Sequence, residues 1–329
     1  IGLPNFYSYN IIKKNSTNTS LTKIYVSNTE ALQILFPRSS VPKIVTNNEP
    51  FLVAVNTSLS VANWSFKIRS LFEENSLTVV NYTKEGQIYK FYLKSINASA
   101  GLYNLSVIAT ADKNYITEEP RAVSIVENYP ETYSFIVIND IRLSPNYPER
   151  ETVLKEAIFQ INMLRPAFVL IIGDIVNSIG GESEATTEIE YKTFYNLLQM
   201  FEVPTYVVSG NHEYYNNGKK YYDKYLGYWP NAPSDEQYHN YSFTFGDSIF
   251  VMVDTGIGNE FVTLKSSQIA WIENTLNHSS AKNKFIVMHV PVFDGSTNGR
   301  KQLEGASQQE IIRIVETYNV TLVLEGHTH

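Results

Sequence analysis

Cysteine is absent from this 329-residue chain. Disulfide bridges, thiolate metal ligands and cysteine nucleophiles are therefore excluded together, but the redox compartment stays open because secreted domains can fold without bridges. Any metal site has to be built from His, Asp, Glu or Asn. Histidine is scarce as well, with six in the whole chain, so the position of each one is informative.

Excess positive charge and long apolar runs are also lacking. Lys and Arg number 26 against 33 Asp and Glu, a formal net charge of -7, which argues against a surface that binds nucleic acid. No run approaches the roughly 18 to 20 apolar residues that span a bilayer. The first residue is Ile rather than Met, so we expect a processed or trimmed piece of a longer protein. The hydrophobic content of 43% over this length predicts more than one core and hence two domains.

Asn-x-Ser/Thr sequons are plentiful, and seven of the ten lie before residue 130. A surface rich in Asn, Ser and Thr also creates accidental sequons, but their abundance favours a secreted or cell-surface glycoprotein whose signal peptide has been removed. N-linked glycans are thus expected partners. The candidate acceptors are Asn15, Asn18, Asn56, Asn63, Asn81, Asn97, Asn104, Asn240, Asn277 and Asn319.

Residues 21–130 are predicted to form an antiparallel β-sandwich. Short β-branched and aromatic runs alternate there with polar turns, as at 50–58 and 88–95. The run at 100–107, AGLYNLSV, resembles a late strand of immunoglobulin-like or fibronectin-like domains. This unit has no histidine and no clustered carboxylates, which favours a spacer or a binding role, self-association included. Residues 1–20 are predicted to be an extended arm or an early edge strand.

After a linker at 126–134 the pattern changes to apolar strands that alternate with helical periodicity. This change predicts an α/β (α+β) domain over 131–329. The expected strands are SFIVIND (134–140), FVLIIGD (168–174), TYVVSGN (205–211), IFVMVDT (249–255), FIVMHVP (285–291) and TLVLEGH (321–327), and the expected helices are 149–165, 265–277 and 307–318.

Side chains able to bind metal follow most of these strands. In open α/β sheets ligands bind at the carboxyl ends of the strands, because successive ends deliver side chains into one crevice. A lone histidine is more often a surface or core residue than a ligand, but four histidines at strand ends, interleaved with carboxylates, reverse that expectation. The pattern predicts a site for one or two cations. Its candidate residues are Asp140, Asp174, Asn211, His212, His289, His327 and His329.

Four ordered motifs carry a family resemblance: GDIVN (173–177), GNHE (210–213), MHVP (288–291) and GHTH (326–329). Together they resemble the calcineurin-like metallophosphoesterase superfamily, from about residue 134 to the end. The sandwich and YSFTFGDSIFVMVDT (241–255) are similar to its purple-acid-phosphatase-like branch. The resemblance implies a two-sheet β-sandwich flanked by helices. Domains of this family continue past the last motif, so we expect a C-terminally incomplete domain followed by further sequence, such as a membrane anchor.

The resemblance also implies a metal centre. Asp174 would bridge two divalent ions, because the two oxygens of one carboxylate can meet two metals. Ligands of these types suit Mn, Fe and Zn alike, so the identity of the ions is open. One site would take Asn211, His289 and His327, and the other would take Asp140 and His329.

Hydrolysis of phosphate esters is the implied activity. A pair of cations polarises the phosphoryl oxygens and lowers the pKa of a bridging water, so that the resulting hydroxide can attack phosphorus. His212 would bind the phosphate and protonate the leaving oxygen, with Glu213 as its orienting partner. The substrate's class stays open.

The chain departs from the family pattern at Arg142. The usual first motif is Asp-x-His, but NDIRL places Arg142 where a ligand histidine stands, and a guanidinium cannot bind a metal. Purple acid phosphatases recover a ligand from a Tyr whose position is here Asn177. Arg142 could point away, bind the substrate phosphate in bidentate fashion, or take the place of the first metal. Coulomb repulsion between the guanidinium of Arg142 and a metal ion about 4 Å away would cost a few kcal/mol.

Two functions therefore compete. The first is an extracellular metal-dependent phosphoric ester hydrolase. The second is a structural, filament-forming or adhesion protein of the cell surface, in which the phosphoesterase domain is degenerate and inactive and the sandwich makes the contacts. The Tyr- and Asn-rich stretch at 213–230 is either an exposed insertion that faces a substrate or partner, or an ordinary loop.

Overall fold

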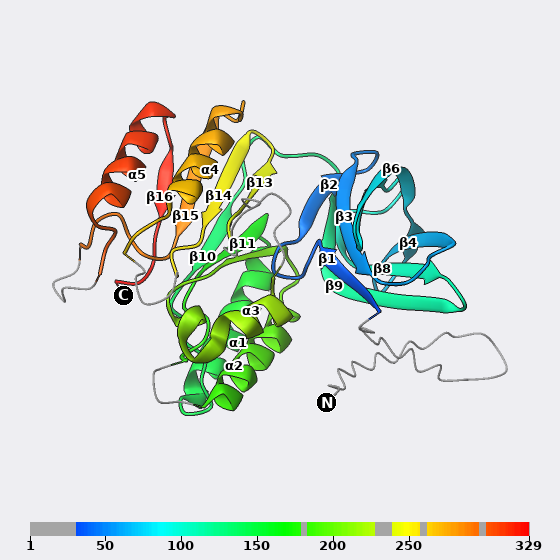
Figure 1. Ribbon diagram of the computed structural model, residues 1–329, viewed down its shortest axis with the longest axis horizontal. Coiled ribbons are helices and arrows are strands. Elements are labelled where there is room, and N and C mark those ends of the chain that lie inside the picture. Colours follow the sequence, from blue (N-terminus) through cyan, green and yellow to red (C-terminus); the bar gives the residue numbers. More distant parts are fainter. Residues whose placement is uncertain (1–30, 179–182, 228–238, 257–261, 296–300, 329) are drawn as a thin grey trace.

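The computed structural model describes residues 31–178, 183–227, 239–256, 262–295 and 301–328 (Figure 1). Its N-terminal unit consists of strands, whereas helices flank the strands of the C-terminal domain.

Two facing sheets form the N-terminal unit. One has the strand order β1-β3-β7-β6 and the other the order β2-β9-β8-β4-β5. The strands pair in antiparallel fashion as predicted, except that β2 pairs with β9 in parallel. The strands are β1 (Leu32–Phe36), β2 (Lys43–Thr46), β3 (Phe51–Thr57), β4 (Asn63–Arg69), β5 (Glu74–Ser76), β6 (Thr78–Glu85), β7 (Ile88–Lys94), β8 (Gly101–Thr110) and β9 (Asn114–Val126).

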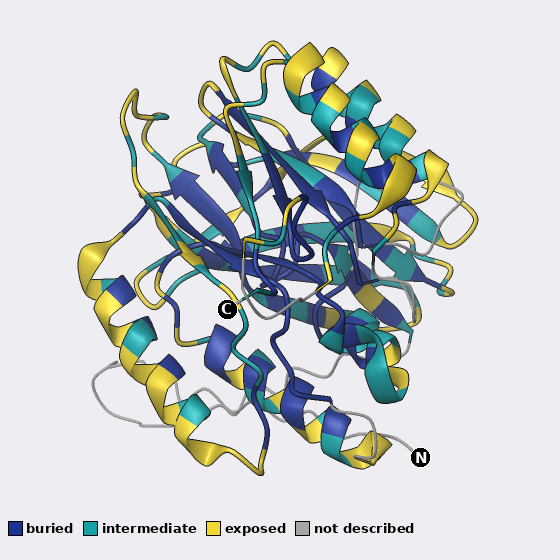
Figure 2. Ribbon diagram, turned by 90° about the vertical axis from the view of Figure 1, so that its left-hand side faces the viewer, coloured by how far each residue is buried: buried dark blue, intermediate teal, exposed yellow. Residues whose placement is uncertain are grey.

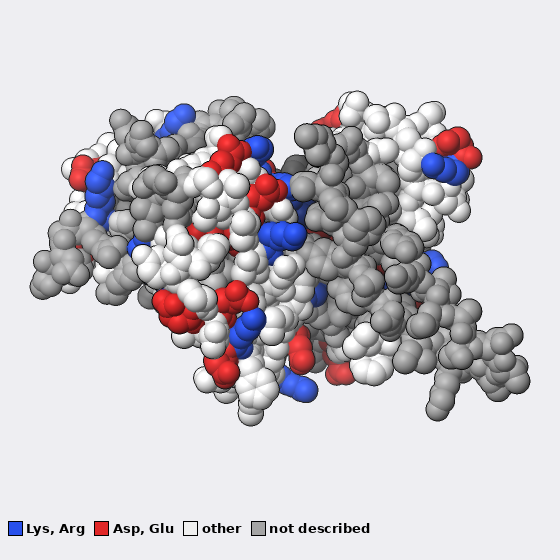
Figure 3. Space-filling view, turned by 90° about the horizontal axis from the view of Figure 1, so that it is seen from below, with Lys and Arg blue, Asp and Glu red and all other residues white. Residues whose placement is uncertain are grey.

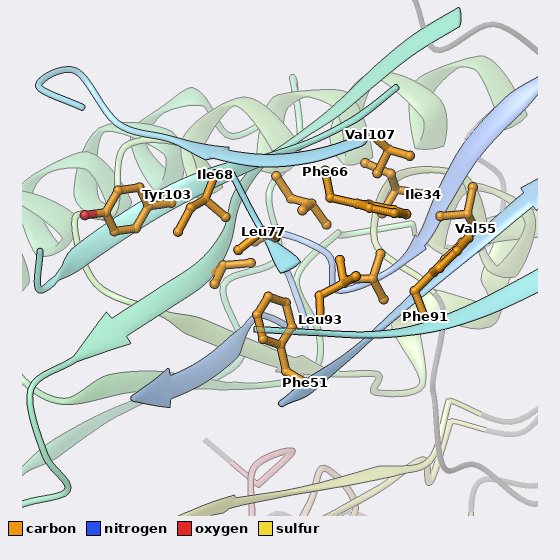
Figure 4. Packing of buried hydrophobic residues seen from close by; sticks show 14 of the residues in the cluster. Ile34, Phe51, Val55, Phe66, Ile68, Leu77, Phe91, Leu93, Tyr103 and Val107 are labelled. Carbon is orange, nitrogen blue, oxygen red and sulfur yellow. The ribbon is translucent and has the colours of Figure 1, made fainter. Parts of the chain in front are cut away.

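Alternating apolar side chains build the core between these sheets (Figure 4). Phe51, Val53 and Val55 of β3 are buried because successive side chains of a strand point to opposite faces. Phe66 of β4 packs on Phe91 of β7 with ring centroids 4.7 Å apart, which joins the two sheets. The assignment of this unit to the immunoglobulin-like or fibronectin-like class stays a prediction.

The C-terminal domain contains two further sheets, β10-β11-β12 and β13-β14-β15-β16. All their pairings are parallel except the hairpin of β13 and β14. The strands are β10 (Phe135–Ile138), β11 (Phe168–Ile172), β12 (Thr205–Val208), β13 (Tyr241–Phe245), β14 (Ser248–Val253), β15 (Asn283–Met288) and β16 (Leu322–Leu324).

Helices cover the outer faces of these sheets, so the domain has four layers (Figures 1 and 2). Helices α1 (Pro148–Leu164), α2 (Glu184–Leu198) and α3 (Gly218–Tyr225) share a core with the first sheet, and α4 (Ser266–Asn277) and α5 (Gly305–Thr317) share one with the second. An aromatic core that includes Phe168, Tyr206 and Phe250 lies between the sheets. The predicted fold class, a two-sheet sandwich flanked by helices, is confirmed.

The stretch at 213–230 folds differently from the exposed insertion considered above. Its described residues, up to 227, form a 3-10 turn at His212–Asn217 followed by α3. Tyr221, Tyr222 and Tyr225 are buried in the core that α2 and α3 share. These aromatic side chains occupy one face of a helix, and packing against Phe194 and Tyr191 of α2 decides their burial.

Ion pairs cover the outer side of this helical layer. Lys220 and Glu184 lie 2.8 Å apart, and Lys224 and Glu188 lie 2.5 Å apart, so both pairs link α3 to α2. Figure 3, which views the molecule from below, shows acidic and basic side chains intermixed among the described residues. Within the described residues no helix is both long and apolar enough to cross a membrane.

The N-terminal unit is joined to the sheet of β10, β11 and β12 by main-chain and side-chain contacts. The N–H of Val207 on β12 donates to Ser40 O at 3.0 Å. Phe36 and Ile44 lie in the same core as Tyr206 and Phe168. The unit therefore completes the hydrophobic core of the C-terminal domain.

Arg121 is the main polar contact of this junction. Its guanidinium is buried and donates to three main-chain carbonyls, Phe201 O at 2.6 Å, Leu198 O at 2.7 Å and Val203 O at 2.6 Å. Burial lowers its pKa to about 9. Leu198 ends α2 and the other two residues follow it, so Arg121 covers the C-terminal end of this helix, where carbonyls lack intrahelical partners.

We expect Arg121→Ala to lower the free energy of unfolding by about 3 kcal/mol or more, because it removes three buried hydrogen bonds of a charged group and leaves a cavity at the junction. Urea unfolding followed by circular dichroism measures this change. The matched control is Arg313→Ala, because Arg313 pairs with Glu273 on the surface, where an ion pair contributes little. Equal stability of Arg121→Ala and the wild type would show that the three bonds do not stabilise the junction.

Candidate metal centre

The ends of the parallel strands bring the predicted ligands together. Asp174 follows β11, His289 follows β15 and His327 follows β16. Gly173 has a positive φ of 70°, and a Cβ there would lie 2.6 Å from Gly210 N. Glycine at this position thus allows the loop after β11 and the loop after β12 to approach each other closely.

Asp174, His289 and His327 form a buried group of potential metal ligands. Within the described residues their ligand atoms all lie within 4.8 Å of one another. Asp174 Oδ1 is 3.1 Å from His289 Nε2. The two histidine rings have centroids 5.2 Å apart. Side chains from distant parts of the chain thus converge, as the strand-end pattern predicted.

Two buried atoms here have no partner among the described residues other than a candidate ligand: Nε2 of His289 faces Asp174 Oδ1 at 3.1 Å, and Oδ1 of Asn211 makes no hydrogen bond. The Nδ1–H of His289 donates to Ile172 O at 2.8 Å, which fixes the tautomer and turns Nε2 toward the carboxylate of Asp174. Buried polar atoms normally make hydrogen bonds, so lone-pair atoms without such partners at this position fit the binding of a divalent cation. Imidazole, carboxylate and amide oxygen are ligands that Mn, Fe and Zn accept.

Asp140 also reaches this group. Its Oδ2 accepts the N–H of His327 at 3.0 Å, and its Oδ1 is 4.0 Å from His289 Nε2. The other predicted ligand of the same site, His329, lies outside the described residues.

Opposite charges shift the pKa values of the donors. Burial raises the pKa of Asp174, but the charges of His289 and His212 outweigh it and lower that pKa to about 2. Burial lowers the pKa of His289, but the charges of Asp174 and Asp140 raise it to about 9. The site thus stabilises positive charge at its centre, and a bound cation would replace the proton of His289.

His212 lies beside Asp174. Its Nε2 is 3.6 Å from Asp174 Oδ2, and its main-chain N–H donates to Asp174 Oδ1 at 3.1 Å. Its Nδ1 hydrogen-bonds to Asn177 O. Burial lowers the pKa of His212, the charge of Asp174 opposes this, and Arg142 lowers it further. The Nε2 of His212 faces the candidate metal ligands. A histidine with a lowered pKa in this position can transfer a proton near neutral pH.

Glu213 does not orient His212, which corrects the expectation from sequence. Its buried carboxylate accepts four main-chain N–H groups, those of Asp174 at 2.8 Å, Ile175 at 2.8 Å, Val176 at 3.3 Å and Gly210 at 2.6 Å. Burial and the charge of Asp174 raise the pKa of Glu213 to about 7. Glu213 therefore ties the loop of Asp174 to the loop of Asn211, and Asn177 O is the partner of His212.

Asn177 and Arg142 are held by a residue that the sequence did not single out. Nη1 of Arg150 donates to Asn177 Oδ1 at 3.2 Å and to Arg142 O at 2.7 Å. The amide oxygen of Asn177 thus faces a guanidinium. Arg142 has a positive φ of 52°, and its N–H donates to Asp174 O at 2.8 Å. Its Nε is buried and makes no hydrogen bond.

The end of β14 supports both ligand loops, a role that we did not predict. Asp254 accepts the hydroxyl of Tyr214, which stands in the turn after His212. Thr255 Oγ1 accepts the N–H of Val290, next to His289, at 2.9 Å. A Cβ at Gly256 would lie 2.1 Å from Gly210 O. The Asp at the end of IFVMVDT was the available signal, since it closes a buried strand as Asp174 does.

His239 and Asn240 belong to the buried network around Asp254. His239 Nε2 lies 2.7 Å from Asp223 Oδ1, and its ring stacks on Tyr222, so it is a core histidine. Asn240 Oδ1 accepts from Asp254 N and Gln268 Nε2.

Asn240 is fully buried, so it cannot carry a glycan in the folded protein, which corrects its place among the candidates. The others divide by exposure. Asn15 and Asn18 lie outside the described residues, and Asn56 and Asn104 are partly buried. The exposed acceptors are Asn63, Asn81, Asn97, Asn277 and Asn319.

Comparisons with known proteins agree with this geometry. The family model of the calcineurin-like phosphoesterases matches residues 133–329. A probable glycerophosphodiester phosphodiesterase, GpdQ, of Arcobacter nitrofigilis is 26% identical over 195 residues, which cover 57% of this chain and 66% of that protein. A probable cyclic nucleotide phosphodiesterase of Coxiella burnetii is 28% identical over 159 residues, which cover 47% of this chain and 60% of that protein.

The purple acid phosphatase PPD1 from yellow lupin (Lupinus luteus) seeds superposes with a TM-score of 0.54 at 14% identity. The alignment covers 94% of this chain, the N-terminal unit included, and 61% of that protein. At this identity the likeness concerns the fold alone.

Proposed function

The chain belongs to the calcineurin-like phosphoesterase family, and on that premise we propose that it is a metal-dependent hydrolase of phosphate esters. The observation that carries this proposal is the convergence of Asp174, His289 and His327, whose donor atoms lie within 4.8 Å of one another. His212 stands at the edge of this group.

The ligands for divalent ions would be Asp174, His289, His327 and Asn211, with Asp140 beside them. Divalent ions bound there would supply Lewis acidity toward the phosphoryl oxygens and lower the pKa of water. The chain itself orients the ligands. Ile172 O and Glu213 hold the imidazole of His289 and the loop of Asp174 in place. His212 donates its Nδ1–H to Asn177 O and turns Nε2 toward the site, so its protonated form can give the Nε2 proton to the leaving oxygen.

Arg142 has a proposed role in binding substrate. Its positive charge acts on His212, so it lies within electrostatic range of the site. Its buried Nε makes no hydrogen bond within the protein. A guanidinium with free donors binds phosphate oxygens well. We therefore favour Arg142 as a phosphate ligand over an Arg142 that points away. The remaining possibility is that Arg142 takes the place of the first metal. Measurement of the ratio of metal to chain tests it, because a ratio of one is expected in that case.

Elemental analysis and hydrolysis of bis(p-nitrophenyl) phosphate and p-nitrophenyl phosphate test the function. The diester comes first, because both curated relatives are named as phosphodiesterases. We expect His212→Ala to lower kcat by about 10²- to 10⁴-fold without loss of metal, the range for a positioned acid. The control is His278→Ala, because His278 is exposed at the end of α4. Protein without metal and without hydrolysis would favour the degenerate, structural alternative.

The proposed location is outside the cell. It rests on the sequons at exposed positions, such as Asn63, Asn81 and Asn97. Mass spectrometry of protein from its native source, before and after treatment with a glycosidase, tests it. Unmodified asparagine at every exposed sequon would contradict the proposal.

A further inference from the structure

A cleft of about 430 Å³ lies between the N-terminal unit and strand β13 of the C-terminal domain. Strands β1, β3 and β7 contribute Phe36, Leu52 and Tyr92 to its walls, and β13 contributes Phe243. None of the residues of the candidate metal centre lines it. Clefts of this size at domain junctions are typical binding sites for small molecules. The walls of this one combine apolar side chains with the polar side chains of Lys43, Ser242 and Thr244.

Lys43, at the start of β2, is the cation of this cleft. Among the described residues no carboxylate lies within 4.0 Å of its ammonium group. The carboxylate that acts on its charge is Glu49, whose Oε2 already accepts from Thr46 N at 3.0 Å and from the hydroxyl of Tyr129 at 2.9 Å. Burial lowers the pKa of Lys43, and the charge of Glu49 only partly opposes this. Lys43 is half-buried and, within the described part of the chain, makes no ion pair within 4.0 Å, so its charge is available for a ligand to neutralise.

The chemistry of the walls selects the ligand. One ammonium group matches a single negative charge, whereas a phosphate dianion is usually held by several cationic or N–H donors. The exposed ring of Tyr92 and its cross-strand partner Leu52 offer an apolar surface on which an aromatic or aliphatic body can pack.

We propose that this cleft binds a small organic carboxylate, with its carboxylate against Lys43 and its apolar body against Leu52 and Tyr92. The proposal does not depend on the metal centre or on the activity of the protein. The contact would combine an ion pair that is shielded from water with burial of apolar surface, and both strengthen in a half-buried site.

Isothermal titration of the full chain with phenylacetate, and with the neutral phenylacetamide, tests the proposal. We expect phenylacetate to bind at least about tenfold more tightly than phenylacetamide, which corresponds to about 1.4 kcal/mol. Lys43→Met keeps the apolar stem and removes the charge, so it should abolish this preference. Lys113→Met is the control, because Lys113 is exposed on the β8–β9 turn and does not line the cleft.

A second variant separates this cleft from the metal centre, which could also bind carboxylates. Tyr92→Ala removes a half-exposed ring and should weaken binding of phenylacetate without unfolding the protein. Absence of binding to the wild type at 10 mM phenylacetate, or equal binding to the wild type and Lys43→Met, would overturn the proposal. Equal affinity for acid and amide would also overturn it, because the ammonium would then play no part.

Discussion

Asp174→Asn is expected to remove most of the bound metal and to lower kcat/KM for phosphate ester hydrolysis by more than about 100-fold. Even partners of a metal ligand, one step removed from the ion, typically contribute 10- to 100-fold, and a ligand shared by two ions contributes more. Asp174 lies at the centre of the donor group, 3.1 Å from His289 Nε2 through Oδ1 and 3.6 Å from His212 Nε2 through Oδ2. Asparagine supplies one oxygen and no charge in its place.

The substitution should act on the site rather than on the fold. Asn and Asp have nearly the same shape, and Asn Oδ1 can still accept the N–H of His212, as Asp174 does at 3.1 Å. Elemental analysis gives the ratio of metal to chain, and steady-state kinetics gives kcat/KM. Asp247→Asn is the control, because Asp247 is an exposed residue of the β13–β14 turn that pairs with Lys282. If Asp174→Asn kept its full metal content and its rate, the donor group would not be the active site.

The proximity of Asp174, His289 and His327 could be predicted from the sequence because the ends of parallel strands lie at one edge of a sheet. No contact between these residues had to be known for this prediction. Apolar runs long enough to be buried also located most strands. Three of the strands in the N-terminal unit, β1, β2 and β5, escaped prediction, because they are only three to five residues long and lack a clear period-two pattern.

Hydrogen-bond partners were harder to predict than ligands. Glu213 is adjacent to His212 in the sequence, which suggested that it orients the imidazole, but its carboxylate meets N–H groups 37 to 39 residues away. The choice between Glu213 and Asn177 as the partner of His212 depends on how two loops fold over each other. Sequence spacing contains no information about that. The same holds for Asn240, whose sequon is intact but whose side chain is buried, with its Oδ1 accepting from Asp254 N and Gln268 Nε2.

Glu213→Gln is expected to lower the free energy of unfolding by about 2 to 4 kcal/mol and to weaken metal binding at least about tenfold. Each carboxylate oxygen accepts two N–H groups, Oε2 those of Asp174 and Gly210 and Oε1 those of Ile175 and Val176. Glutamine keeps one acceptor and replaces the other by an NH₂ group. One pair of buried N–H groups would then face a donor, whichever way the amide turns.

The loss of these hydrogen bonds should also weaken metal binding, because the N–H groups belong to the loops that carry Asp174 and Asn211. Gly173 and Gly210 pack so closely that a Cβ on either would collide with the other loop. A shift of the Glu213 side chain therefore moves Asp174 and Asn211 relative to each other. Interiors are densely packed, so displaced loops cannot relax without cost. Chemical denaturation gives the stability change, and titration with Mn²⁺ or Zn²⁺ in competition with a chelator gives the change in affinity.

Glu119→Gln separates this effect from the general cost of altering a buried carboxylate. Glu119 lies at the junction with the N-terminal unit, is nearly inaccessible, accepts from Ser39 N at 2.9 Å and pairs with Arg38 Nε at 3.0 Å. Its substitution should destabilise the fold while leaving metal affinity and kcat unchanged. If Glu213→Gln lost stability but bound metal as tightly as the wild type, the carboxylate would contribute to the stability of the fold and not to metal binding. A matching fall in affinity, absent from Glu119→Gln, would identify Glu213 as the residue that holds the two ligand loops in register.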